Sequence, residues 1–592
     1  MCKSYGHSLF VTLSYSLYRP CPRGLFEALE LNSADQISPG QRSNVTTDDS
    51  ASTHDLPLSQ ISPRARLIEH SNCNLASRRQ PGWVLALSFS KSANALRSRT
   101  RYFSMLSIEP FILTMKCTTM RSLALPLLAF FSLTISARPH GHEEHPVCII
   151  GAGPAGLSAA SRLKSKGIKS MIFEKQEAVG GKCQSWYDED GTFYPLGAAF
   201  LSNVSYPETI AILSQTDVST QPFSLAGGRE AFSYNYTDGR IQQVPALAPQ
   251  FLAQVSAEIP RYVGLWNTRF RPVGVANFKN GVPDEFTVSG AEWFRINNFT
   301  ALPILLVTPV ALYGYGDINI VPALYILQYM TPDVLTAFVG LHGVYYMDFN
   351  KMWVEFAKNN LRETTIKTSA DVRRVDRSGA NPVLMYTEPA ANATHHKRSK
   401  QTCSSVIFAF PPSIDNLKHV GLDLTPQETS TFSNVTTHQY YSSVSEFALP
   451  FGVSYAATSP APSIPPPNDG QPVAILRFSP RSNISVAWSW GPYDYQPEQT
   501  ARHLLVDSLR KINKDPRQID ASVAPFCDDD IKAFRKWDYF PHFEGPALRA
   551  GAYAAYHSLQ GVKKTYFASG LAGMELVEFA IRGGYDVVDS YL

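Results

Sequence analysis

The 592-residue sequence has few cysteines, little charge imbalance and no apolar run of the ~20 residues that a membrane-spanning helix needs. Only four of its eight cysteines lie beyond residue 137: Cys148, Cys183, Cys403 and Cys527. Their wide spacing excludes a CxxC redox pair and a cysteine-ligated zinc cluster. Cys148 lies in an apolar run and Cys403 directly precedes another, so we expect both to be small, buried apolar side chains.

The charge of the chain is nearly balanced, at +3 overall. Residues 1–114 hold 12 Lys and Arg against 8 Asp and Glu, whereas residues 138–592 hold 39 against 42. Because no segment concentrates basic residues, we do not expect nucleic acid as a partner. The length allows two substantial domains.

The N-terminal part of the sequence has the pattern of an extension followed by a signal peptide. Residues 1–114 lack a sustained apolar period, which predicts disorder or an upstream start codon that is not used. Met115–Arg121 is positively charged, Leu123–Ile135 is apolar, and residues 135–137 offer a small-residue cleavage site. We therefore expect a signal peptide over residues 115–137 and a secreted product; a short membrane anchor is the alternative.

Sequons for N-glycosylation support a secretory route. Six asparagines are followed two residues later by Ser or Thr with no intervening Pro: Asn203, Asn235, Asn298, Asn392, Asn434 and Asn483. Single sequons occur by chance, but six behind a signal sequence predict a secreted glycoprotein with these sites on surface loops.

The stretch from Val147 to Lys182 carries the strongest motif. A short apolar run, Val147–Ile150, leads into Gly-Ala-Gly-Pro-Ala-Gly at residues 151–156, an amphipathic segment, and a second apolar run that ends in Glu174. This order predicts a βαβ unit that binds a dinucleotide. In such a unit the first glycine allows the tight turn, the second lets the backbone approach a pyrophosphate, and the third lets helix and strand pack closely.

The expected role of Glu174 is to accept hydrogen bonds from an adenosine ribose.

At the other end of the chain, Thr565–Gly570 is expected to be a strand, with a helix from Met574 to Ser590 whose N-terminus faces a redox ring. The apolar run Ala301–Tyr315 contains two prolines and is too short to span a membrane, which favours a buried helix or pocket wall.

Further elements follow from periodicity and from turn signals. The expected helices cover residues 322–330, 333–339, 348–359 and 498–512. The expected strands cover residues 364–368, 371–376, 383–387, 403–410, 439–449 and 473–478. Residues 390–401 are polar and predict a solvated hairpin loop; their pair His395 and His396 is a less favoured candidate for a metal site.

From Pro146 to Leu592 the chain resembles the FAD-dependent amine oxidase and phytoene desaturase superfamily, and within it fungal flavoproteins similar to beta-cyclopiazonate dehydrogenase. The paired glycines after the acid mark an FAD site in this superfamily. The residues that carry the resemblance are Gly151-Ala-Gly-Pro-Ala-Gly156, Glu174, Gly180-Gly181-Lys182, Leu196-Gly-Ala198, the Val372 strand, Val406–Pro412, Trp537, Gly551-Ala-Tyr553 and Ala568-Ser-Gly570.

The resemblance implies FAD as the cofactor, and we expect no metal site. The residues that it implies for FAD binding are Gly151, Gly153, Pro154, Ala155, Gly156, Glu174, Lys175, Gly181, Lys182, Gly197, Ala198, Val372, Gly570 and Met574. Trp537 and Tyr553 match aromatic positions that line the substrate pocket in this superfamily, or else are plain core aromatics.

Two positions depart from the pattern of the superfamily. Leu571 stands where many members have an acidic residue after the glycine of the C-terminal strand, and residues 439–449 contain no lysine of the kind that many amine oxidases place beside the flavin. These departures weaken an assignment as a polyamine or monoamine oxidase. No catalytic acid or base can be named from the sequence.

The sequence thus predicts a two-domain α/β flavoprotein with a Rossmann-like FAD domain and a mixed sheet-and-helix substrate domain. We expect two-electron oxidation of a C–N or C–C bond in an apolar small molecule, with dioxygen or another electron acceptor. The alternatives are an NAD(P)-dependent dehydrogenase, a flavin monooxygenase using NAD(P)H, and an inactive secreted flavin-binding protein. The expected FAD domain covers residues 146–225, 364–436 and 540–592, and the expected substrate domain covers 226–363 and 437–539.

The signal peptide predicts where the mature chain begins. Translation from Met115 or Met120 followed by cleavage after Ala137 should give a secreted protein whose N-terminus lies at or near Arg138. Intact-mass measurement of the deglycosylated secreted protein checks this expectation, and a mature N-terminus upstream of Met115 would contradict it.

Overall fold

The computed structural model describes residues 145–592, except for 275–276, 391–395, 467 and 492–495. The expected disordered extension, the signal peptide, Asn392 and His395 lie outside the described residues.

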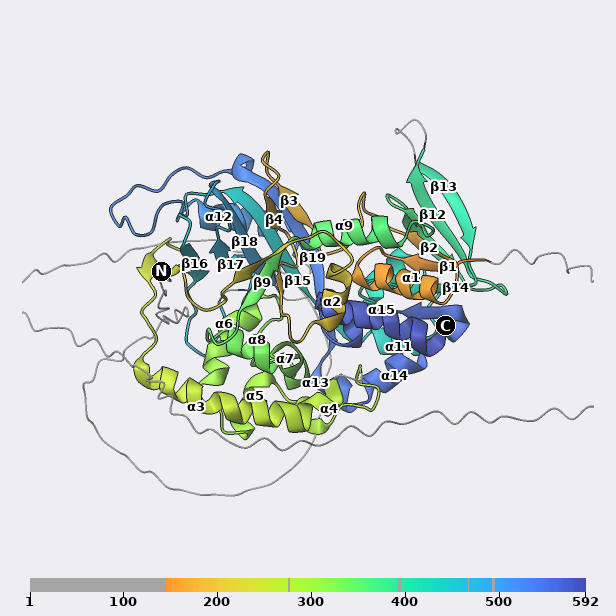
Figure 1. The fold of residues 1–592 in the computed structure, drawn as a ribbon, viewed down its shortest axis with the longest axis horizontal. Coiled ribbons are helices and arrows are strands. Elements are labelled where there is room, and N and C mark those ends of the chain that lie inside the picture. Colours follow the sequence, from red (N-terminus) through yellow and green to blue (C-terminus); the bar gives the residue numbers. More distant parts are fainter. Residues whose placement is uncertain (1–144, 275–276, 391–395, 467, 492–495) are drawn as a thin grey trace, which may run out of the picture. The chain divides into compact units, whose positions relative to one another are not determined.

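A parallel five-stranded sheet gathers strands from widely separated parts of the chain (Figure 1). Its strand order is β10-β2-β1-β14-β20, and every neighbouring pair is parallel. All residues of β1 and β14 are buried, as expected for apolar strands covered on both faces. The strands are β1 Val147–Ile150, β2 Ser170–Phe173, β10 Thr365–Lys367, β14 Ser405–Phe408 and β20 Thr565–Phe567.

Helix α1 (Pro154–Ser165) connects β1 to β2 and packs against the C-terminal helix α15 (Val577–Tyr591). Figure 1 shows these two helices side by side, so the first and last helices of the described chain share one layer. Proline at the first position of α1 suits its start, because that position needs no backbone N–H donor. The predicted βαβ unit is present.

A small antiparallel sheet flanks the parallel one. It consists of β11 (Asp371–Asp376), β12 (Val383–Pro389) and β13 (His396–Thr402). The expectation of a loop over residues 390–401 is wrong from His396 onward, because this stretch pairs with β12 in regular register. Its polar composition hid a strand at the edge of a sheet, where charged side chains are common.

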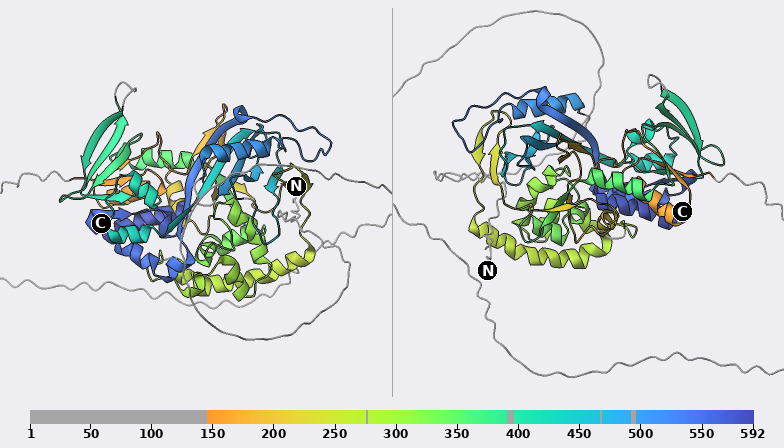
Figure 2. Two further views of the ribbon diagram at one scale, coloured as in Figure 1. Left: turned by 180° about the vertical axis from the view of Figure 1, so that it is seen from behind. Right: turned by 45° about the horizontal axis from the view of Figure 1, so that its top comes forward.

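A seven-stranded sheet of order β19-β15-β18-β17-β16-β7-β8 forms the second half of the fold. It is antiparallel except for the pair β16 and β7. Figure 2 shows α12 (Glu498–Leu509), in blue, on one face of this sheet and the yellow-green to green helices of residues 249–337 on the other. The strands are β7 Glu230–Tyr234, β8 Ile241–Gln243, β15 Val435–Glu446, β16 Val453–Ala457, β17 Pro472–Leu476, β18 Ile484–Gly491 and β19 Ile531–Phe543.

Helix α6 (Leu302–Leu312) packs on this sheet and confirms the predicted buried helix. Its first turn is capped from a distance, since the Glu258 carboxylate accepts hydrogen bonds from the backbone N–H groups of Thr300 and Leu302, at 2.7 and 2.9 Å. That carboxylate replaces a local cap at a buried helix start. In the part of the chain that the structure describes, no helix has both the length and the apolar character to cross a membrane.

The other elements are shorter. The three helices expected between residues 322 and 359 are present within one or two residues of their predicted ends. These helices and their neighbours are α2 Pro207–Leu213, α3 Pro249–Leu265, a π-helical turn Trp266–Phe270, α4 Arg271–Gly274, α5 Gly290–Ile296, α7 Ala323–Tyr329, α8 Pro332–Ala337, α9 Phe349–Asn360, α10 Ile414–His419, α11 Pro426–Phe432, α13 Gly545–Arg549 and α14 Ala552–Ser558. The remaining strands are β3 Ser185–Tyr187, β4 Phe193–Pro195, β5 Phe200–Leu201, β6 Thr220–Phe223 and β9 Val344–Met347.

Cys148 and Cys403 form a disulfide, so the expectation that both are merely small apolar side chains is wrong. Cys148 lies in β1 and Cys403 directly precedes β14, the parallel neighbour of β1, which brings the two Cα atoms to 5.6 Å. The bond joins residues 255 positions apart and is fully buried. It ties the first strand of the parallel sheet to a strand from the middle of the chain.

Removal of this disulfide should destabilise the protein. We expect Cys148→Ser or Cys403→Ser to lower the free energy of unfolding by about 2–4 kcal/mol, because the bond closes a long loop in the unfolded chain. Urea unfolding with and without reductant measures the effect. Cys527→Ser is the matched control, since Cys527 is free and exposed; equal unfolding midpoints in oxidised and reduced wild-type protein would contradict the prediction.

Candidate functional site

A cavity of about 770 Å³ runs from the glycine motif to the seven-stranded sheet. Its lining comes from the start of α1, the loops after β2 and β14, the start of α15, and the inner face of the larger sheet. This volume lies within the range of about 300–1,000 Å³ typical of small-molecule sites. The cavity thus joins the two halves of the fold.

Glycines hold three backbone segments in direct contact at one end of the cavity. A Cβ on Gly151, which has φ +108°, would lie 2.7 Å from the carbonyl oxygen of Ala409. A Cβ on Gly181, which has φ +57°, would lie 2.9 Å from the Cα of Gly153. Any side chain at either position would force the segments apart. The bare backbone left there can approach a ligand closely.

The starts of two long helices line the cavity. Helix α1 begins after Gly153 and α15 begins after Leu576, and neither first turn has a side-chain cap. First-turn N–H groups without such a cap, together with the positive end of the helix dipole, suit phosphate and other negative charge. Both ends of the described chain therefore present the backbone N–H groups of a helix start to the same cavity. At the start of α15 the carboxylate of Glu578 also lines the cavity and is paired with Arg582 at 2.8 Å.

Glu174 lines the cavity at the end of β2 and is 4% exposed. Its carboxylate accepts hydrogen bonds from the backbone N–H groups of Ala152 and Gln176, at 2.7 and 2.9 Å. Burial raises the pKa of this carboxyl above its ordinary value, against the effect of these hydrogen bonds. A carboxylate has about four acceptor positions, so capacity remains for the hydroxyls of a ribose.

Lys182 and Glu575 form an ion pair of 2.9 Å that joins the loop after β2 to the segment before α15. Leu571, at the position where the resemblance implies an acid, is fully buried. The carboxylate beside Gly570 comes from Glu575 instead, because a Cβ on Gly570 would lie 3.1 Å from its Oε2. The carboxylate beside Gly570 thus comes from a position that the resemblance to the superfamily did not indicate.

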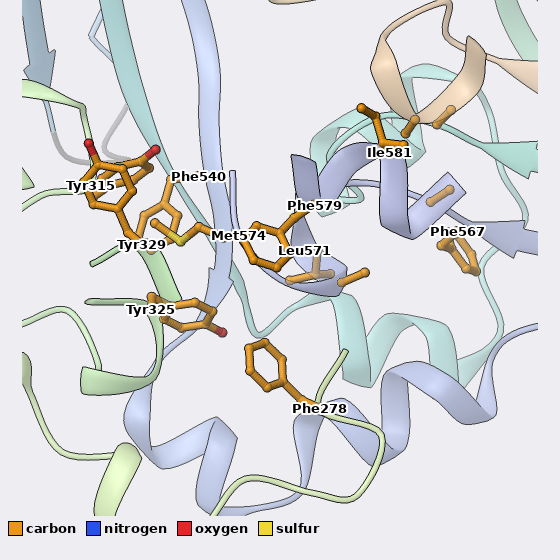
Figure 3. Packing of buried hydrophobic residues seen from close by; sticks show 14 of the residues in the cluster. Phe278, Tyr315, Tyr325, Tyr329, Phe540, Phe567, Leu571, Met574, Phe579 and Ile581 are labelled. Atoms are coloured by element: carbon orange, nitrogen blue, oxygen red, sulfur yellow. The ribbon is translucent and has the colours of Figure 1, made fainter. Parts of the chain in front are cut away.

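The helix expected to begin at Met574 begins at Val577, so that part of the prediction is wrong. A short 3₁₀ turn at Gly570–Ala572 comes first, and the chain then turns Met574 into the core. Figure 3 shows its side chain between Phe540 and Phe579. Glu575 and Leu576 line the cavity, whereas Met574 does not.

Of the two aromatic residues expected near the substrate, only Trp537 lines the cavity. Its Nε1 donates a hydrogen bond to the carbonyl oxygen of Leu196, at 2.8 Å, next to the predicted flavin-facing residues. Tyr553 is a core aromatic: its hydroxyl donates to the carbonyl oxygen of Leu571, at 2.9 Å, and lies 3.0 Å from the hydroxyl of Tyr325. The substrate-pocket interpretation of Tyr553 is therefore wrong.

Several tyrosines line the cavity together with Trp537, among them Tyr315, Tyr329, Tyr440 and Tyr539. Tyr315 ends the run that was predicted as a buried helix or pocket wall, whereas the sequence did not indicate a site role for the other three. The ring of Tyr539 stacks on those of Tyr440 and Tyr315, with centroids 4.9 and 5.8 Å apart. Figure 3 shows Tyr315 beside Tyr329. Burial raises the pKa of every one of these phenols, so they are neutral near pH 7. Because side chains alternate between the two faces of a strand, the bounds of β15 and β19 would have been enough to place Tyr440 and Tyr539 on one face of the sheet.

The structure brings most of the predicted site residues to this cavity. Those that line it are Gly151, Gly153, Pro154, Ala155, Glu174, Lys175, Gly181, Lys182, Gly197, Ala198, Val372, Gly570 and Trp537. Gly156 lies behind it, where a Cβ would come within 2.0 Å of the carbonyl oxygen of Gly151, so its role is close packing of helix and strand. Among the described residues, no cluster of His, Cys, Asp and Glu could hold a metal ion, and His396 lies in β13.

This lining fits FAD. The glycine contacts leave backbone at the position of a pyrophosphate, two helix starts supply N–H donors, and a buried carboxylate has acceptors free for a ribose. The cavity then continues beyond these groups into an aromatic chamber, which leaves room for a redox ring and a substrate.

Comparison with known proteins gives the family. The model of the family described as flavin containing amine oxidoreductase matches residues 154–451. The chain belongs to this family. It is an FAD-dependent oxidoreductase, and the predicted fold class, a two-domain α/β flavoprotein, is confirmed. The predicted domain boundaries stay a prediction.

The relatives are distant. An uncharacterised protein of Acanthamoeba polyphaga mimivirus is 24% identical over 76% of this chain and 93% of its own length. The FAD-dependent oxidoreductase dpchF of Colletotrichum higginsianum is 23% identical over 54% of this chain and 67% of its own, and beta-cyclopiazonate dehydrogenase of Aspergillus flavus is 22% identical over 52% and 64%. A fatty acid isomerase from P. acnes shares the fold, with a TM-score of 0.63 and 20% identity over 76% of this chain and 99% of its own.

The glycine contacts predict which substitutions release the cofactor. Gly181→Ala should weaken FAD binding by about 1–3 kcal/mol, because its Cβ would push the loop away from Gly153. That loss corresponds to roughly tenfold or more in affinity. Flavin absorbance relative to protein absorbance, measured after dialysis, reports the remaining FAD.

Gly264→Ala in α3 is the matched control, because a Cβ there meets no atom within 4 Å. Far-ultraviolet circular dichroism should show the same fold for both variants. Full flavin content in Gly181→Ala protein would contradict the cofactor site described above.

Proposed function

We propose that the protein is a secreted FAD-dependent oxidase or dehydrogenase that carries out two-electron oxidation of an apolar small molecule. The observation that carries this proposal is the aromatic chamber at the far end of the FAD cavity. Its walls include Tyr440, Tyr539 and Trp537 together with Tyr313 and Leu312 at the end of α6. Such walls favour an apolar ligand, because they remove its surface from water and offer few polar partners.

The residues of the chain would supply binding, orientation and exclusion of water. FAD, when bound, supplies the two-electron redox chemistry. The stacked tyrosines are neutral, so they can donate hydrogen bonds but do not remove a proton near pH 7. The bond between Trp537 Nε1 and the carbonyl oxygen of Leu196 fixes the wall of the chamber against the backbone of Gly197 and Ala198. Orientation of the reacting bond is what such walls contribute to the rate.

The secretory part of the proposal rests on the disulfide and the sequons. Disulfides persist in oxidising compartments and are rare in the cytosol, and that between Cys148 and Cys403 is buried in the core. Four sequon asparagines are exposed, as glycan attachment requires: Asn203, Asn298, Asn434 and Asn483. Asn235 is half-buried.

Anaerobic titration of the purified holoenzyme tests the redox part. We expect at least one compound in a panel of neutral and carboxylated apolar alkyl, aryl and indole derivatives to bleach the flavin absorbance, and air to restore it. NADPH and NADH should leave the flavin oxidised, which separates this function from that of a monooxygenase. A flavin that no panel member reduces would favour the inactive binding protein and contradict the proposal.

A further inference from the structure

Arg229 brings a positive charge to the wall of the substrate chamber. It stands in the loop between β6 and β7, and it alternates with Ala231, which faces the chamber. Arg229 and Ala231 both line the cavity. The guanidinium is therefore presented to the same space as the aromatic walls.

The guanidinium of Arg229 has no acidic partner among the described residues. Its Cζ lies 4.3 Å from the ring centroid of Phe223, and its Nη1 donates to the carbonyl oxygen of Ser224 at 3.4 Å. Burial lowers the pKa of Arg229 below its ordinary value. An arginine remains protonated even so, because its ordinary pKa exceeds 12. Most of its five N–H donors are left without a protein acceptor in the described structure.

The surroundings of Arg229 do not offset its charge. The loop that enters β7 and the elements β5, β6, β7, β9, β16, β17 and α6 contribute no charged residue but Arg229 to the described lining. The other edge of the seven-stranded sheet adds Lys536 and Asp538 from β19, and α12 adds Glu498. Lys536 Nζ donates to the carbonyl oxygen of Gln496 at 3.0 Å, and the Asp538 carboxylate accepts from Gln439 Nε2 at 3.4 Å.

The lining of this chamber also includes the small side chains of Ala456 and Ala474, which are paired between β16 and β17. A charge that lines an apolar space is usually compensated by an opposite charge, and no acidic side chain of the described residues forms an ion pair with Arg229.

We propose that Arg229 binds a carboxylate of an otherwise apolar substrate, which makes the substrate class apolar monocarboxylic acids. The proposal rests on the proposed function above and narrows it. The planar fork of an arginine matches the two oxygens of a carboxylate. A single guanidinium suits a single negative charge, whereas a phosphate with nearly two charges would normally recruit further cations. The other cation in the chamber lining, Lys536, donates to the carbonyl oxygen of Gln496.

Binding of the carboxylate by Arg229 would also fix the orientation of the ligand in the chamber. The carboxylate would lie at the Arg229 and Phe223 end, and the apolar body would extend along Ala474 and Leu312 toward Trp537, which lines the same cavity. The bond to be oxidised would then lie in the apolar body and away from the acid group.

Direct binding to the holoenzyme tests the inference with two matched probes, decanoate and its neutral isostere decanamide. Wild-type protein should bind decanoate at least about tenfold more tightly than the amide, as expected for a charge-assisted pair out of water. Perturbation of the flavin spectrum and of tryptophan fluorescence reports binding below the micelle concentration. Higher ionic strength should weaken binding of decanoate only.

Arg229→Met should remove the preference for decanoate over decanamide. Its affinity for decanamide should stay within about twofold of wild type, and its FAD content should be unchanged. Arg229→Lys should retain part of the preference for decanoate. Arg481→Met is the matched control, because Arg481 is exposed and does not line the cavity. Equal affinity for acid and amide in wild-type protein, an undiminished preference in Arg229→Met, or no binding of decanoate would each overturn the inference. Anaerobic flavin reduction by neutral apolar compounds alone would overturn it too, yet leave the proposed oxidation standing.

Discussion

The close approach of three backbone segments around Gly151, Gly153 and Gly181 is the constraint on which the site depends. A side chain on Gly151 or Gly181 would collide with the facing backbone, so the first turn of α1, the loop after β2 and the loop after β14 can meet only as they do here. The buried disulfide holds β1 beside β14, and the packing of α1 on α15 brings the C-terminal segment to the same place. The cofactor cavity is thus formed by segments from the beginning, middle and end of the described chain.

The charged side chains at the two ends of this cavity differ in whether they have a partner of opposite charge. Near the glycines, the Lys182 and Glu575 pair is internally compensated, and Glu174 is held by backbone donors. In the aromatic chamber the lining phenols are neutral, and Arg229 carries a charge that has no acidic partner among the described residues. The contrast separates a cofactor end whose charges are already satisfied from a substrate end with a charge that a ligand can satisfy.

Local sequence patterns predicted the parts of the fold whose signals lie within one short stretch. The βαβ unit, with its glycines and Glu174, and the buried helix α6 followed from glycine spacing and apolar periodicity. The other cofactor residues came from the resemblance to the superfamily. Pairings between distant residues could not be obtained this way. The disulfide depends on β1 lying next to β14, the carboxylate beside Gly570 comes from Glu575, and the polar strand β13 is defined only by its pairing with β12. Tyr553 and Met574 failed as site residues because the turn at Gly570–Ala572 directs them into the core.

The central claim is that the two ends of the described chain hold one FAD. Quantification of the cofactor released when the purified wild-type protein is denatured tests this claim most directly, with the pellet examined for flavin that stays attached to the chain. The account predicts a yellow protein with FAD close to equimolar with the polypeptide, counting both fractions. A colourless protein that cannot be reconstituted with FAD, or one that releases NAD instead, would contradict it.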